Sequence, residues 1–92
     1  MKKSIKIEKN VLDKWSEQTN ENDHINVRIN IASYFSFIRE ENFFKKILSI
    51  SEKKKYLTES QRTSYLKMSE AMLKKIKKIY GDDVYNSVLA CL

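Results

Sequence analysis

The chain contains no proline and a single glycine, Gly81, and this scarcity constrains its fold more than any other feature. Tight β-hairpin turns depend on residues that accept positive φ angles, above all glycine, so an all-β domain has almost no support in this sequence. Helices need far fewer such residues. We therefore expect a mainly α fold, a compact bundle of four or five short helices that forms one small domain over residues 1–92.

The segment from Thr58 to Tyr80 carries the clearest helix signals. Thr58 and Gln61 have the spacing of a capping box, in which each side chain accepts a hydrogen bond from the backbone N–H of the other residue. Gly81 suits the left-handed conformation that commonly follows a helix. Apolar residues at helical spacing predict the buried face: Tyr65, Leu66, Met68, Met72, Leu73, Ile76, Ile79 and Tyr80.

Helices are also predicted on either side of this segment. Asp82 or Asp83 can cap a short C-terminal helix with an apolar face made of Val84, Tyr85, Val88, Leu89 and Leu92. Upstream, a helix from about Arg39 to Ser51 has an apolar face made of Phe43, Phe44, Ile47, Leu48 and Ile50. A charged connector, Glu52–Lys55, is expected between this helix and the next.

Two periods compete in residues 24–37. Apolar and polar side chains alternate from His24 to Ile31, which is typical of a strand rich in β-branched residues. The same stretch also places a set of apolar residues within one arc of a helix: Val27, Ile31, Tyr34, Phe35 and Ile38. Asp23 as a cap and the absence of turn residues favour the helix.

The residues before this stretch predict smaller elements. Ser4–Glu8 alternates as a short strand would, so one N-terminal strand can lead the helices. Val11, Leu12 and Trp15 predict a short helix that closes near Asn20.

This order of strand, helix, loop and helix over residues 4–38 resembles the ribbon-helix-helix family of DNA-binding proteins. The resemblance covers about a third of the chain and implies a dimer in which the strands pair, with Ser4 and Lys6 facing the major groove. The sequence departs from the family pattern at three positions: Gln18, Thr19 and Ile25. A strand-led α+β fold is therefore the alternative to the helical bundle.

Positive charge is concentrated in one segment. Residues 45–78 carry eleven Lys or Arg and three acids, a local charge of +8, whereas the rest of the chain, with seven bases and nine acids, sums to −2. A positive block on a regular element can neutralise a row of phosphates, so this segment predicts a polyanionic partner. The candidate nucleic-acid-binding residues are Lys45, Lys46, Lys53, Lys54, Lys55, Arg62, Lys67, Lys74, Lys75 and Lys78.

The arrangement of these residues favours nucleic acid over a merely solvated surface. Lys67, Lys74 and Lys78 share the outer side of the predicted helix, and only Glu70 interrupts the bases between Arg62 and Lys78. Bases of a single strand also need flat groups on which to stack, and the best candidates are Tyr56 and Arg62. Solvated lysines on an amphipathic helix remain the alternative interpretation.

The sequence does not favour catalysis, a metal site or a cofactor. His24 is the sole histidine, so a pair of histidines for acid–base chemistry is impossible, and a zinc site would need more ligands. One glycine cannot form a phosphate-binding loop. The adjacent acids Glu40–Glu41 and Asp82–Asp83 are expected to stabilise helix N-termini instead.

We therefore expect a small basic, non-enzymatic protein that binds RNA or DNA in a regulatory role. The alternative is a protein-interaction module or inhibitor, of the kind phages and mobile elements encode, that docks its basic face on an acidic protein. A homodimer is compatible with so small a core. The lone Cys91 suits a reducing cytoplasm, and Lys6, Glu8 and Lys9 interrupt the apolar stretch that a signal peptide needs.

Overall fold

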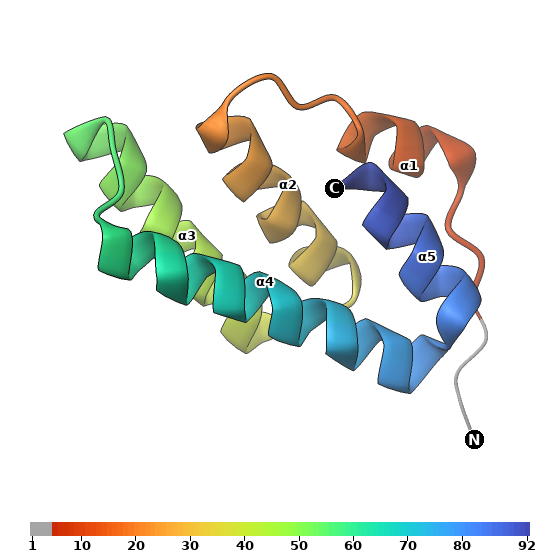
Figure 1. Cartoon of the computed structure of the whole chain (residues 1–92). Helices are drawn as coiled ribbons and strands as arrows, with labels where there is room; N and C mark the ends of the chain where they lie inside the picture. The colour runs from red at the N-terminus through yellow and green to blue at the C-terminus, as the bar shows by residue number, and fades with distance from the viewer. Residues whose placement is uncertain (1–4) are drawn as a thin grey trace.

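The computed structural model describes residues 5–92, which form five α-helices and no strand (Figure 1). The mainly α prediction is confirmed. The helices are α1 (Lys9–Trp15), α2 (Glu21–Tyr34), α3 (Ile38–Lys54), α4 (Glu59–Tyr80) and α5 (Asp82–Cys91).

The predicted N-terminal strand is wrong over its described part. Residues 5–8 have no regular structure, and Ser4 lies outside the described residues. Ile7 is instead buried against the helical core. A strand needs a partner for its backbone hydrogen bonds, and residues 5–92 contain no other strand. The apolar and polar residues alternate instead because every second side chain packs against the helices. The strand-led, ribbon-helix-helix-like alternative is not the fold of residues 5–92, because these residues form helices without a strand.

Residues 21–34 form helix α2, so this stretch follows the helical period and not the strand period. Asn20 caps it, because the Asn20 side chain accepts a hydrogen bond from the Asp23 N–H at 2.9 Å, so the expected Asp23 cap is wrong by three residues. Val27 and Ile29 are both buried although they lie about 160° apart around the helix. Such a wide buried arc makes a central helix look strand-like in sequence.

The core joins all five helices at their facing sides. Helix α2 packs against α3, α4 packs against both α3 and α5, and α1 covers α5 and α2 (Figure 1). The largest fully buried side chains come from α2, α3, α4 and α5: Ile25, Ile31, Phe44, Met72, Ile76 and Val88.

Several residues of the predicted apolar faces lie outside this core. Tyr34, Ile38, Leu66 and Leu89 are substantially exposed, and Leu66 is 54% exposed. On α4 the buried face is the narrower set Tyr65, Ser69, Met72 and Ile76, spaced at i, i+4, i+7 and i+11. Leu66 is about 100° from Tyr65 around the helix and so falls at the margin of the contact.

The local signals around α4 are confirmed. Both hydrogen bonds of the Thr58–Gln61 capping box are present, and Gly81 has a φ of 96°, in the region that glycine enters without a steric penalty. By contrast, the predicted connector Glu52–Lys55 is wrong. Helix α3 continues to Lys54 because no residue there opposes a helix, and the connection is residues 55–58.

Lys55 ends α3 in a left-handed conformation, with a φ of 67°. That conformation costs a residue with a Cβ about 1–2 kcal/mol. We therefore expect Lys55→Gly to raise the free energy of unfolding by about 0.5–1 kcal/mol, measured by denaturant titration. Lys54→Gly, inside the helix, is the matched control and should lower it by a similar amount. A less stable Lys55→Gly protein would contradict the argument.

Candidate nucleic-acid interface

The ten predicted binding residues all lie on α3, on the connection after it or on α4, and all are exposed. Helices α3 and α4 run antiparallel, because the short connection joins the end of α3 to the start of α4 and Glu40, near the start of α3, contacts Lys75 in the last turns of α4. The two helices pack against each other, and α3 passes behind α4 in the view of Figure 1.

Three of the predicted residues form a straight row along α4. Lys67, Lys74 and Lys78 lie within about 20° of one line on the helix, directly opposite the buried Ile76. Each is exposed, and none makes an ion pair within residues 5–92. We call these three residues the α4 lysine row.

A second row runs along α3 and includes a residue that the sequence-based prediction missed. Arg39, Lys46 and Lys53 follow one another at seven-residue spacing, which keeps them within about 20° of their neighbours in the row. All three are exposed and make no ion pair with any described residue. We call them the α3 basic row. The seven-residue spacing was a signal that could have identified Arg39.

A shallow cleft lies between the helices where the α3 basic row begins. This cleft, of about 250 Å³, is lined by Arg39 and Glu40 from α3 and by Met68, Ala71 and Lys75 from α4. Arg39 belongs to the α3 basic row, and Ala71 lies between Lys67 and Lys74 of the α4 lysine row. Arg39 and Lys75 are thus the cations, one from each helix, that line this cleft.

The remaining predicted cations are engaged differently. Lys45 pairs with Glu41 one turn earlier in α3 at 3.1 Å. Arg62 binds both carboxylate oxygens of Glu21 in α2, with N···O distances of 2.9 and 3.4 Å. Their charges are partly neutralised within the fold.

Of the predicted cations, Lys75 contributes most to holding the helices together. Its Nζ lies 2.8 Å from the Oε2 atom of Glu40, whose side chain is only 7% exposed, and 4.4 Å from the centre of the Phe37 ring. Glu40 therefore does more than stabilise the N-terminus of α3, the role expected from the sequence. The pair joins the start of α3 to the end of α4.

Lys53, Lys54 and Lys55 gather at the C-terminal end of α3. Cations there interact favourably with the partial negative charge of the unpaired helix carbonyls. This local role accounts for part of their positions, yet all three remain exposed and unpaired among residues 5–92.

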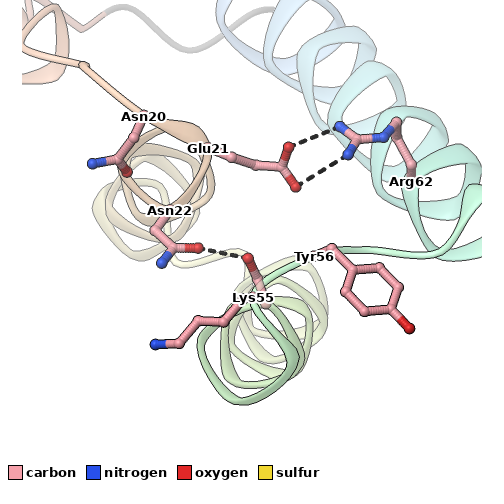
Figure 2. Close-up of a pocket in the computed structure, with 7 residues that line it drawn as sticks. Asn20, Glu21, Asn22, Lys55, Tyr56 and Arg62 are labelled. Atoms are coloured by element: carbon pink, nitrogen blue, oxygen red, sulfur yellow. Dashed lines mark hydrogen bonds and ion pairs between the residues drawn. The ribbon is translucent and has the colours of Figure 1, made fainter.

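A polar cleft of about 360 Å³ lies beside that helix end (Figure 2). It is lined by Asn20, Glu21, Asn22, Ser51, Lys55, Tyr56 and Arg62. The Ser51 hydroxyl donates to the Asn22 side-chain oxygen at 2.6 Å, which ties α3 to α2. Tyr56 projects from the connection on the side away from Lys55.

A second arginine near Arg62, the half-buried Arg28, packs between α2 and α4. The Nε of Arg28 donates to Ser69 Oγ at 2.8 Å, and its guanidinium carbon lies 5.2 Å from the centre of the Tyr65 ring. Burial lowers the pKa of the Arg28 guanidinium and raises the pKa of the Tyr65 phenol. These two side chains connect α2 to α4 and lie on the inner side of α4, away from the basic rows.

The other residues considered for chemistry lie apart from one another. His24 is exposed in the first turns of α2, and Cys91 is buried, with its Sγ 3.4 Å from the Leu12 carbonyl oxygen. Within residues 5–92, no three His, Cys, Asp or Glu side chains are grouped as metal ligands would be, and no helix has the length and apolar character to cross a membrane.

Comparisons with protein-family models, with curated proteins and with solved structures gave no match to this chain.

Proposed function

We propose that this protein binds RNA or DNA through the α3 basic row and the α4 lysine row, in a regulatory rather than catalytic role. The observation that carries the proposal is the alignment of six exposed cations without ion-pair partners among the described residues, on two helices that pack side by side. Exposed acids on these helices, such as Glu52 and Glu70, are fewer than the cations, whereas a surface that serves solubility alone normally mixes both signs of charge.

The length of the rows suits a nucleic-acid backbone. At a rise of about 1.5 Å per residue, the α4 lysine row spans about 16 Å and the α3 basic row about 21 Å. Each row is thus long enough to contact several phosphates of one strand. Contacts of lysine with phosphate position a nucleic acid without reading its sequence, so we expect weak sequence specificity. We place this role in the cytoplasm, since a single buried cysteine suits a reducing compartment.

The test replaces Lys67, Lys74 and Lys78 together with glutamine. Because all three side chains are exposed, the fold should be unchanged. Binding should weaken about equally for all sequences, and the slope of log affinity against log salt should fall by roughly two to three, about one for each lost phosphate contact. Fluorescence anisotropy with labelled oligonucleotides at several salt concentrations measures both quantities.

A matched control removes the same charge from elsewhere. Lys6, Lys9 and Lys14 are also exposed and lie in or before α1, away from the α3–α4 surface. Their replacement with glutamine should lower the slope by much less. If the two triple variants behave alike, or if the unaltered protein shows no salt-dependent binding, the proposal is wrong. The alternative of an acidic protein partner would then be tested with the same variants.

A further inference from the structure

Tyr56 is the aromatic residue that the fold leaves most exposed among the described residues. It is 61% exposed, whereas Trp15, Phe44 and Tyr65 are at most 6% exposed. It also makes none of the ring–ring contacts that join eight of the other rings. Burying an aromatic side chain contributes about 1.5–3 kcal/mol, so the fold forgoes this stabilisation at Tyr56.

The connection between α3 and α4 holds the ring in place. Lys55, immediately before it, ends α3 in the left-handed conformation, and Leu57, immediately after it, is 6% exposed and packs in the core. Tyr56 is therefore fixed on both sides while its own side chain points to solvent (Figure 2). A ring whose backbone is already ordered loses little conformational entropy when a ligand stacks on it.

The chain segment that precedes the ring is positively charged. Lys53, Lys54 and Lys55 precede it directly, and none has an ion-pair partner among residues 5–92. Arg62, which lines the same cleft, is already bound to Glu21. The unpaired lysines nearest to Tyr56 in the sequence thus come from the end of α3, and the Lys55 side chain extends on the opposite side of the connection from the ring.

We infer that Tyr56 is a stacking platform for an unpaired base of single-stranded nucleic acid, while Lys53, Lys54 and Lys55 contact the flanking phosphates. Single-strand binding proteins combine an aromatic face for the base with cations for the backbone. A duplex keeps its bases stacked on one another and offers them no free face. The inference rests on the proposed function and adds a preference for single strands.

The test compares a single-stranded oligonucleotide with a duplex of the same sequence. Tyr56→Ala should weaken single-strand binding by about 5- to 150-fold, the range found when one stacked base loses its aromatic partner, and leave duplex binding unchanged. Tyr56→Phe retains the ring and should bind like the unaltered protein. Ile38→Ala is the matched control, because Ile38 is 68% exposed and lies at the other end of α3.

A fluorescence measurement gives an independent readout. Tyr56→Trp adds an indole at the surface, whereas the natural Trp15 is 4% exposed. Single strands should quench the emission of the added indole at low and at moderate salt, and duplexes should not. If Tyr56→Ala binds single strands as tightly as the unaltered protein while the Lys67, Lys74 and Lys78 variant loses affinity, the inference is wrong and the proposed function stands. Loss of neither would overturn both.

Discussion

Replacement of Phe44 with alanine should lower the free energy of unfolding by about 3–5 kcal/mol. Phe44 has no exposed surface, and its ring centre lies 5.8 Å from that of Tyr65, so it connects α3 to α4 in the core. Truncation would remove this contact and leave a cavity that rigid helices cannot close. Stabilities of proteins of this size are about 5–15 kcal/mol, so the loss is a large fraction of the total.

Denaturant titration followed by circular dichroism measures this effect. The adjacent Phe43 is the matched control, because it has the same side chain and is only partly buried against the core. Phe43→Ala should therefore cost clearly less than Phe44→Ala. Equal losses for the two variants would show that the described orientation of α3 is incorrect.

Replacement of Lys75 with methionine should lower the free energy of unfolding by about 2–3 kcal/mol. The change leaves the Glu40 carboxylate, 7% exposed, without the one cation that pairs with it among residues 5–92. Loss of one partner from a fully buried pair costs about 3–5 kcal/mol, and the smaller value applies because Lys75 is itself 45% exposed. Lys74→Met, one residue earlier and unpaired, should change stability by less than about 0.5 kcal/mol.

A second substitution distinguishes the loss of the Glu40–Lys75 ion pair from other effects of a change in α4. In Lys75→Met with Glu40→Gln, no buried charge is left unpaired, so much of the lost stability should return. If the double variant loses as much free energy of unfolding as the two single variants lose together, the ion pair is not the cause. Lys75→Met should also leave the salt slope of nucleic-acid binding nearly unchanged, because Lys75 is engaged within the fold.

Local signals explain how much of the fold could be predicted. The cap at Thr58, the stop at Gly81 and the period of α4 involve residues within a few positions of one another, and all three are present in the structure. The exposed position of the α4 lysine row follows from the same periodicity. The end of α3 was predicted less well, because no residue near Lys54 marks a boundary.

The candidate site also has features that the sequence predicts and features that it does not. That Lys67, Lys74 and Lys78 share one side of a helix can be read from their spacing, and so can the row of Arg39, Lys46 and Lys53. That Arg39 and Lys75 line one cleft depends on how α3 and α4 pack. The exposure of Tyr56 depends on the anchoring of its neighbour Leu57 in the core.

By itself, the sequence determined the helical class, the limits of α4 and the positive segment, since capping, helical period and charge density are properties of neighbouring residues. The tertiary structure alone decided that Ser69 is buried and Leu66 exposed, and that Lys75 and Arg62 are held by carboxylates 35 and 41 residues away. The physical reason is that these outcomes depend on where helices cross. A crossing is fixed by the packing of side chains from several helices at once, and no local pattern encodes it.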